Sequence, residues 1–416
     1  MPDKKKILML SDHALCTSGV GTQSRHLING LLKKGSWTVR QFGAAIKHSS
    51  YETTVVNDDF IIKPVDGFGT KELLRVTLAT EKPDILLIFT DPRFFIWLFE
   101  MEDEIHQTCP IAWWHVWDNA PSPKFNDVLY EGADLINCHS YLTYELLNDR
   151  FSDKVNFVPH SLPEEIFFPI QPEHVKTLKE KMLGPDRKDW FVAEWTNRNA
   201  RRKRPNDLLW AWSIFLNQLY DKAGHKDAIL IMHTDPLDSE GPNLRVAADM
   251  LGISENVIFS TERVDFSHMN ILHNVSDVCI NISYAEGFGL PTLEAMQTGT
   301  PIIALKTGGL TRQVEDHRDG TENGVALPVE FRSLVGSQSV PYIYEDYVGV
   351  DTIADAFMKL YDLGPEARRA LGQKARGYVT SEFPYQKTID DWHRTMNETI
   401  ERYHANKDRR WTKVCF

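Results

Sequence analysis

Two glutamates flank a glycine-rich turn in the segment SYAEGFGLPTLEAM, residues 283–296. Glu286 lies in the turn, and Glu294 follows Pro291, which suits the first position of a helix that Gly299 would stop. We expect both carboxylates to face one cavity, lined by the backbone amides of residues 287–289. Ionised carboxylates accept hydrogen bonds from hydroxyl groups. The segment therefore predicts a site for sugar or ribose hydroxyls.

Glycoside hydrolysis is an alternative use of two acids. That chemistry places its carboxyl groups on either side of the scissile bond. Glu286 and Glu294 belong to one loop and the helix after it, so they would approach a ligand from one side. The spacing favours hydroxyl binding over hydrolysis.

A basic run follows the predicted strand 191–193. Five cations occupy the seven positions 198–204, with no acid among them. Ligands of open α/β sheets bind beyond the carboxyl ends of strands. Arg198 and Lys203 could there neutralise a diphosphate leaving group, the arginine through its planar fork and the lysine as a point charge. A solvated surface and a nucleic-acid patch remain alternatives, although no stacking aromatics alternate with the cations.

A second glycine loop, SGVG, lies near the amino terminus. Gly19 and Gly21 precede a predicted helix and would let backbone amides approach a phosphate. A nicotinamide dehydrogenase fits poorly, because Ser24 replaces the third glycine and no acid ends the second strand. No Lys-Ser or Lys-Thr pair follows a glycine loop, which argues against a kinase or ATPase. A turn without a ligand remains the alternative.

The elements that must position these residues are strands alternating with helices. Apolar runs rich in β-branched residues predict parallel sheets covered by helices, at 7–10, 85–89, 111–114, 191–193, 228–232, 257–259, 278–282 and 301–305. The best linker is 158–172, with four prolines. A final helix carries an apolar stripe at Ile389, Trp392, Met396, Ile400 and Tyr403. Residues 329–350 have no clean period and are expected to carry short strands.

Length and composition predict a folded protein of two domains. The chain has 416 residues, 42% of them hydrophobic and 25% charged. Its net charge of −12 argues against a general polyanion binder. The five cysteines, including Cys415, show no metal-type pairing, and no apolar run reaches membrane-spanning length. We expect a cytoplasmic protein in which neither the apolar 93–99 nor the basic end 407–416 inserts stably into a membrane.

The segment Glu286–Met296, EGFGLPTLEAM, resembles the signature of retaining glycosyltransferases of the GT-B fold, family four. Arg198 and Lys203 have the family's spacing of an arginine and a lysine, and the SGVG loop and TGGL at 307–310 extend the likeness. The resemblance covers most of the chain and is weaker at 43–84 and 329–350.

The resemblance implies a role for each matching residue. Glu294 would hold the ribose of the nucleotide, Glu286 the transferred sugar, and Arg198 with Lys203 the diphosphate. Backbone groups would line the donor, at Gly287, Phe288, Gly289, Leu290, Gly19, Gly21 and Val264, the last beside the base. His115, in WWHVWDN, matches a histidine beside the sugar, although a histidine satisfied in the core is the alternative.

The resemblance also implies the fold and the reaction. The fold would be α/β, GT-B, with two Rossmann-like domains facing each other across a cleft and the last helix returning to the first domain. The domains would be 1–165 with 386–416, and 166–385. The donor would be a nucleoside-diphosphate sugar, with no cofactor or metal and no enzyme nucleophile. The acceptor, a saccharide, a lipid-linked group or a modified nucleic acid, is not determined.

Two rival functions remain. The basic run 198–204 would also suit a glycosyltransferase that modifies a hydroxylated base in DNA. From a different class, the chain could be a nucleotide-sugar binding module without turnover. The presence of both glutamates with Arg198 and Lys203 disfavours an inactive site.

Overall fold

The chain divides into two compact units in a computed structural model that describes residues 4–406. Unit 1 comprises Met1–Ser161, Gly336–Ile343 and Tyr385–Phe416, and unit 2 comprises Leu162–Val335 and Tyr344–Pro384. The first junction, between Ser161 and Leu162, lies inside the proline-rich segment 158–172 and four residues before the predicted boundary at 165. Unit 1 also includes 336–343, whereas the predicted second domain, 166–385, contains these residues.

Unit 1 is built on a sheet whose strands are β1 (Lys5–Asp12), β2 (Trp37–Ala44), β3 (Thr54–Asn57), β4 (Phe60–Pro64), β5 (Ile85–Thr90), β6 (Ile111–His115), β7 (Leu135–Cys138) and β8 (Val155–Phe157). The strand order is β3-β4-β2-β1-β5-β6-β7-β8, and every pair is parallel except β3 with β4. Because β2 and β5 lie on opposite sides of β1, the order changes direction at β1. The glycine loop after β1 thus lies where such sheets bind ligands.

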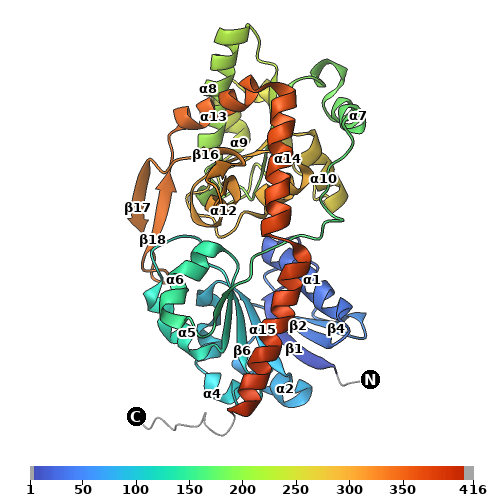
Figure 1. The fold of residues 1–416 in the computed structure, drawn as a ribbon, viewed down its shortest axis with the longest axis vertical. Coiled ribbons are helices and arrows are strands. Elements are labelled where there is room, and N and C mark those ends of the chain that lie inside the picture. Colours follow the sequence, from blue (N-terminus) through green and yellow to red (C-terminus); the bar gives the residue numbers. More distant parts are fainter. Residues whose placement is uncertain (1–3, 407–416) are drawn as a thin grey trace. The chain divides into compact units, whose positions relative to one another are not determined.

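Helices cover the sheet of unit 1 (Figure 1). They are α1 (Gly19–Lys33), α2 (Lys71–Glu81), α3 (Ile96–Phe99), α4 (Glu102–Ile105), α5 (Asp127–Gly132), α6 (Tyr141–Phe151) and α15 (Tyr385–Ala405). Between β5 and α3 lies a short 3-10 helix, η1 (Pro92–Phe95). In the apolar stretch 93–99, Phe95, Leu98 and Phe99 are buried as expected, whereas Phe94 and Ile96 are exposed.

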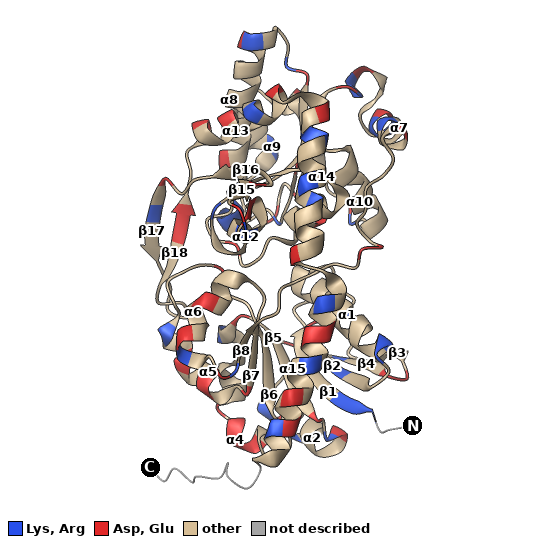
Figure 2. Ribbon diagram, in the orientation of Figure 1, with Lys and Arg blue, Asp and Glu red and all other residues tan. Residues whose placement is uncertain are grey.

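The last helix, α15, packs into the core of unit 1, as predicted. All five residues of its apolar stripe are buried, and four of them, Ile389, Trp392, Met396 and Ile400, join the cluster formed by α1 and the strands. The rings of Trp392 and Trp114 lie 5.4 Å apart, and Asn137 donates a hydrogen bond to Thr395 at 3.0 Å. Both positively and negatively charged residues occur along the helix (Figure 2). The basic end 407–416, with Cys415, lies outside the described residues.

Unit 2 contains a parallel six-stranded sheet, formed by β9 (Phe191–Thr196), β10 (Ala228–His233), β11 (Val257–Ser260), β12 (Val278–Asn281), β13 (Ile302–Leu305) and β16 (Gly324–Leu327). The order is β11-β10-β9-β12-β13-β16, so β9 separates β10 from β12. The loops after β9 and β12 therefore start at neighbouring strand ends, at the point where the order changes direction. These loops carry the basic run and the EGFGL turn.

The helices of unit 2 are α7 (Pro172–Leu183), α8 (Pro205–Ala223), α9 (Leu244–Met250), α10 (Phe266–Val275), α11 (Leu290–Thr298), α12 (Thr311–Val314), α13 (Val350–Asp362) and α14 (Gly364–Glu382). Trp195, Trp212 and Phe357 lie in the core that α8 and α13 form with the sheet. Two small two-stranded sheets follow, β14 (Glu315–Asp316) with β15 (Thr321–Glu322), and β17 (Phe331–Val335) with β18 (Ile343–Tyr347), and the residues that connect β17 to β18 are assigned to unit 1. The short strands expected in 329–350 are thus present.

The α/β fold class predicted from the sequence is confirmed by the two parallel sheets. All eight predicted strands are present, each within one or two residues of its expected bounds or extended beyond them. Within residues 4–406, none of the helices combines the length and the apolar character needed to cross a bilayer.

Candidate active site

The core of the site is a buried ion pair between the loops after β9 and β12. Lys203 ends the short helix η4 (Arg201–Lys203), and Glu286 lies in the loop before α11. The Lys203 ammonium group donates to Oε2 of Glu286, and each side chain is only 11% exposed. Asn281 Nδ2 and Ser283 Oγ donate to the same oxygen at 3.3 and 3.2 Å. The structure thus brings together two of the predicted site residues, 83 positions apart in the chain.

The charges around Glu286 keep its carboxyl group ionised. Burial by itself would raise its pKa, but Lys203 and Arg202, with the hydrogen bonds from Lys203 and Asn281, lower the pKa to about 2. Arg202 Nη1 lies 3.7 Å from the carboxylate. At neutral pH, Glu286 is therefore an acceptor of hydrogen bonds and not a proton donor.

The EGFGL turn takes a backbone shape that requires glycine. Gly289 has a φ of +92°, in the left-handed region, and directly precedes α11. A Cβ atom there would lie 2.5 Å from Cδ2 of Leu310. The TGGL loop packs on this turn: the amide of Gly309 donates to the carbonyl of Glu286 at 2.8 Å, and Gln313 Nε2 donates to the carbonyl of Phe288 at 2.6 Å. The turn and the start of α11 are held as one unit.

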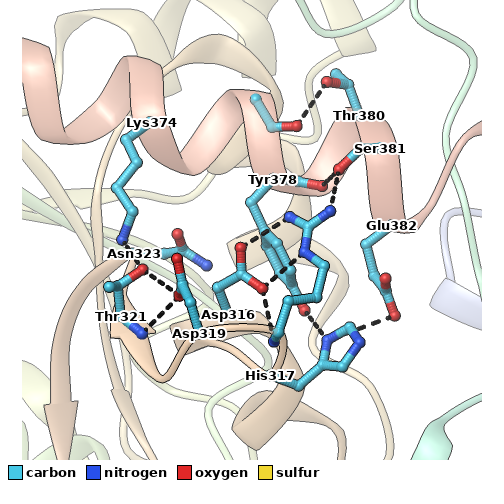
Figure 3. Close-up of polar contacts among 12 residues, drawn as sticks. Asp316, His317, Asp319, Thr321, Asn323, Lys374, Tyr378, Thr380, Ser381 and Glu382 are labelled. Carbon is cyan, nitrogen blue, oxygen red and sulfur yellow. Dashed lines mark hydrogen bonds and ion pairs between the residues drawn. The ribbon is translucent and has the colours of Figure 1, made fainter.

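A polar network anchors the segment after the TGGL loop to α14 (Figure 3). Arg318 forms a two-oxygen ion pair with Asp316 and donates to Ser381 Oγ at 3.0 Å. The Tyr378 hydroxyl, on α14, donates to the backbone carbonyl of Arg312 at 2.6 Å and lies 3.2 Å from Nδ1 of His317. We interpret this network as structural support for the loop that carries Gly309.

The helix α11 begins at Leu290, with Pro291 in its first turn, and ends before Gly299, as the sequence predicted to within one residue. No side chain caps its N-terminus, and its first turn contains no acid. The first turn thus carries no carboxylate that would neutralise the positive end of the helix dipole. The dipole and the first backbone amides of the helix therefore favour the binding of an anion. This helix begins at Leu290 and is directly preceded by Gly287, Phe288 and Gly289.

Glu294 lies on α11 with its side chain 12% exposed. Its Oε2 atom is 3.2 Å from Nε2 of His273, on α10. Nδ1 of the same imidazole is 2.7 Å from Oε1 of Glu194, in the middle of β9. The side chains of His273 and Glu194 are both fully buried. Glu294 thus ends a buried row of carboxylate, imidazole and carboxylate.

Sequence reasoning missed Glu194 and His273. The signal was present, since Glu194 is the one acid in the strand FVAEWT and His273 shares a helix face with Met269 and Asn270, which are buried. An ionisable residue at a strand position that faces the core requires a partner. Its identity could not be read from the sequence, because the three residues come from three separate elements.

Arg198 does not join the buried pair in the structure. Its guanidinium group forms a two-point ion pair with Asp238, with distances of 2.8 and 3.1 Å, and its side chain is 64% exposed. Arg201 pairs in the same way with Glu345, at 2.8 and 3.1 Å. The acids that pair with Arg198 and Arg201 thus come from a loop and from β18, and the basic run is not an unopposed patch of positive charge.

The first glycine loop differs from its prediction. Gly19 and Gly21 do not precede α1 but lie in its first turn. Ser18 caps the helix, accepting from the amide of Gly21 at 3.0 Å and donating to Oδ2 of Asp12 at 2.5 Å. A Cβ atom on Gly21 would lie 2.7 Å from the carbonyl oxygen of His13, so this glycine is explained by close packing.

His115 ends β6 and lies in the core of unit 1. Its side chain is buried, with Nε2 2.9 Å from the hydroxyl of Tyr130 and its ring against Trp113. Burial, with His139 nearby, lowers its pKa well below the ordinary value, so the imidazole is neutral. His115 is thus buried and neutral, its Nδ1 atom has no hydrogen-bond partner among the described residues, and its predicted contact with a sugar stays a prediction.

Val264 lies in the loop between β11 and α10 and is partly exposed. Its predicted role beside a base stays a prediction. In the part of the chain that the structure describes, no group of three or more His, Cys, Asp or Glu side chains is arranged to hold a metal ion.

Part of this chain is similar to a known protein family. Residues 196–330, which carry the basic run, Glu286 and Glu294, match the family described as Glycosyl transferases group 1. The D-inositol 3-phosphate glycosyltransferase 2 of Catenulispora acidiphila is 37% identical over 156 residues. That alignment covers 37% of this chain and 33% of the relative, so the chain matches only about a third of that protein's length.

Solved structures show the fold over nearly the whole chain. The sucrose-phosphate synthase of Thermosynechococcus elongatus has a TM-score of 0.72 at 17% identity, over 96% of this chain and 100% of its own. HepE of Anabaena, solved with UDP and glucose, has a TM-score of 0.68 at 14% identity, over 95% and 100% of the two chains. The fold of this protein is therefore GT-B.

Proposed function

We propose that this chain, whose residues 196–330 match the family Glycosyl transferases group 1, transfers a sugar from a nucleoside-diphosphate sugar to a hydroxyl acceptor, with retention of configuration and without a metal ion. The observation that carries the proposal is the buried Lys203–Glu286 pair beside the start of α11. It combines a cation, an ionised hydroxyl acceptor and a helix N-terminus without a side-chain cap. These are the groups that a sugar diphosphate requires.

In this proposal, the nucleotide-sugar is held at three points. Glu294 accepts from the ribose hydroxyls, and Glu286 accepts from a hydroxyl of the sugar. Lys203 and the first amides of α11 bind the diphosphate, because a helix N-terminus favours anions. HepE was solved with UDP, so UDP is the first nucleotide to test.

The reaction develops negative charge on the departing diphosphate. The bond between the anomeric carbon and the phosphate oxygen breaks, and a bond to the acceptor oxygen forms on the same face of the sugar. The acceptor proton passes to the departing phosphate, so no enzyme nucleophile is needed. Preorganised donors aimed at developing charge usually supply the largest part of such catalysis. Lys203 supplies that charge from the protein, which is why we propose that no metal is required.

The binding experiment is calorimetry with nucleoside diphosphates on the whole chain. We expect Glu294→Ala to weaken UDP binding by roughly 10- to 100-fold, the effect of losing hydrogen bonds to a charged group. Glu286→Ala should spare UDP binding and impair transfer. The control is Glu366→Ala, an exposed glutamate on α14. Equal UDP affinity in the wild type and Glu294→Ala would refute the assignment of Glu294.

The reaction experiment follows the sugar. NMR of the product of a donor with a known anomeric configuration should show retention, and activity should persist in excess EDTA. Hydrolysis of the donor without acceptor would exclude a binding module without turnover. Inversion of configuration, or loss of activity in EDTA, would contradict those parts of the proposal.

The structure does not favour the DNA-modifying alternative. Arg198 and Arg201, in the run that suggested it, are already paired with Asp238 and Glu345. The acceptor and the cytoplasmic location stay predictions from the sequence.

A further inference from the structure

The buried row Glu194–His273–Glu294 has a composition that core packing does not require. Glu194 occupies a fully buried position of β9, where its neighbours Ala193 and Trp195 are apolar core residues. Replacing a buried ion pair by apolar residues of similar size is often neutral or stabilising. Stability alone is therefore a poor explanation for burying two carboxylates and an imidazole together.

The geometry connects this row to one functional group. Nδ1 of His273 is bound by Glu194 at 2.7 Å, so the ring cannot turn without losing that contact. Nε2 then points at Oε2 of Glu294, at 3.2 Å. Glu294 is the outermost member and the only one of the three with solvent exposure, at 12% against none for His273. The row leads from the core to the carboxylate that faces the proposed ligand.

We propose that His273, oriented by Glu194, is a positioning residue that fixes the Glu294 carboxylate for the ribose hydroxyls of the donor. This inference rests on the proposed function. His273 engages one oxygen of Glu294, so the other oxygen is presented in a set direction. A carboxylate that is already oriented loses less conformational freedom when the ligand binds. The same logic makes outer partners important for histidines and carboxylates that hold metals.

The charge on His273 supports this role. Burial lowers its pKa, but Glu194 and Glu294 outweigh burial and raise the pKa to about 10. The imidazole is therefore protonated at neutral pH and can donate from both nitrogens at once. Two other titratable groups face the row. His233, on β10, has a pKa lowered by burial, and the Cys279 thiol, on β12, has a pKa raised by burial and by both carboxylates, so both are uncharged at neutral pH.

The test compares two ligands, UDP and its 2′,3′-dideoxyribose analogue, by calorimetry on the whole chain. The wild type should prefer UDP. In His273→Gln, we expect this preference to fall by about tenfold, the size of one charge-assisted hydrogen bond, with little change in affinity for the analogue. A merely structural role would weaken both ligands equally. The matched control is His268→Gln, an exposed histidine on the same helix, 65% exposed, which should leave the preference unchanged.

A second variant keeps the shape and removes one charge. Glu194→Gln should lower the pKa of His273 toward the neutral range, because it removes the first of the carboxylates that raise it. The preference for UDP should then fall as pH rises from 6 to 8 in this variant, while the wild type stays constant over that range. The pH dependence in Glu194→Gln tests the positioning role even if His273→Gln does not fold.

The possible failures are distinguishable. If the wild type binds UDP but has no preference for it over the analogue, the ribose role of Glu294 is wrong, and the proposed function loses that contact. If the wild type prefers UDP and both His273→Gln and Glu194→Gln keep that preference at every pH, only the positioning role is overturned.

Discussion

The two glycine loops of this protein, SGVG in unit 1 and EGFG in unit 2, have similar sequences. They differ in the charged and capping groups beside the helix that follows each of them. Each lies at a point where its sheet changes direction, and each leads into a helix. At the start of α1, Ser18 already accepts from the amide of Gly21, and the carboxylate of Asp12 lies behind Ser18. At the start of α11, the N-cap residue Gly289 makes no side-chain cap hydrogen bond, and Lys203 is bound to the adjacent Glu286.

The difference teaches that glycines before a helix are not sufficient for a phosphate site. An anion at α1 would have to displace a serine cap and approach a buried acid. Burial raises the pKa of Asp12, although its hydrogen bond from Ser18 works in the other direction. An anion at α11 would meet a helix end without a side-chain cap and a lysine that is paired with Glu286. The predicted phosphate-binding roles of both loops stay predictions, although the contacts of Gly19 and Gly21 give no support to theirs.

The largest expected effect comes from breaking the ion pair beside the EGFG loop. Lys203→Met leaves the Glu286 carboxylate buried without its cation, which should cost about 3 to 5 kcal/mol in the free energy of unfolding. Chemical denaturation measures this loss, and transfer activity should disappear. The control is Lys306→Met, which breaks a half-exposed pair with Glu315 and should cost ~1 kcal/mol or less. Equal losses in the two variants would contradict our description of the site.

The same variant predicts a pH dependence. The folded protein lowers the pKa of Glu286 from 4.5 to about 2, so the stabilisation by Lys203 is complete above pH 4.5 and is lost as pH falls toward 2. The difference in stability between wild type and Lys203→Met should therefore shrink across that range. A constant difference down to pH 2 would show that the pair does not depend on an ionised Glu286.

A smaller effect is expected from the backbone of the EGFG turn. Gly289→Ala combines a φ of +92° with a Cβ atom 2.5 Å from Leu310, and should cost about 1 to 3 kcal/mol. It should also weaken UDP binding, because the turn leads into the helix end that binds the diphosphate. Gly252→Ala, with a φ of +69° and open space around it, measures the backbone strain alone. If both variants bind UDP as the wild type does, the turn is not part of the donor site.

At the SGVG loop, the expected effect concerns folding and not binding. Ser18→Ala removes the cap of α1 and should cost about 1 kcal/mol of stability, as N-cap serines do elsewhere. UDP affinity should stay unchanged. Thr70→Ala, which removes the cap of α2, is the control for loss of a cap alone. If UDP binds more tightly to Ser18→Ala and not to Thr70→Ala, the result would support the predicted role of Gly19 and Gly21 in the donor site.

The smallest effect tests whether Arg198 can serve the diphosphate. Asp238→Asn releases the guanidinium group of Arg198 from an exposed ion pair that contributes about 0.2 to 1 kcal/mol. UDP affinity should then rise by up to about fivefold, because 1.4 kcal/mol corresponds to a tenfold change. Glu345→Gln, which releases Arg201, is the matched control. An unchanged affinity in Asp238→Asn would leave Lys203 as the cation of the site and remove Arg198 from it.

Much of the fold could be predicted because its signals are local. The apolar runs of the central strands and the stripe of α15 each reflect one element packing on a core. The edge strands β3 and β8 were missed because they are short and only partly buried, and β4, β7 and β16 were missed as well. The start and end of α11 were predicted from Pro291 and Gly299, whose backbone preferences act at single positions.

The site could be predicted only in part. Glu286 and Lys203 were recognised by their spacing within family motifs, and the structure brings them together. The partners of the other charges were not predictable. Arg198 pairs with Asp238, which lies 40 residues further along the chain, and Arg201 pairs with Glu345, which lies 144 residues further along. His115 was assigned by its place after a strand, yet its burial depends on Tyr130 and Trp113 from the surrounding core.

The sequence by itself therefore determined the alternation of strands and helices, the two-sheet α/β class and the residues that can accept hydroxyls or bind phosphate. Each of these follows from periodicity or from a motif within about ten residues. Only the tertiary structure decided which helix N-terminus is capped, which cations are already paired and that His273 links Glu194 to Glu294. The reason is physical: electrostatic and hydrogen-bonding energies depend on distances through space, and the fold sets those distances between loops far apart in the chain.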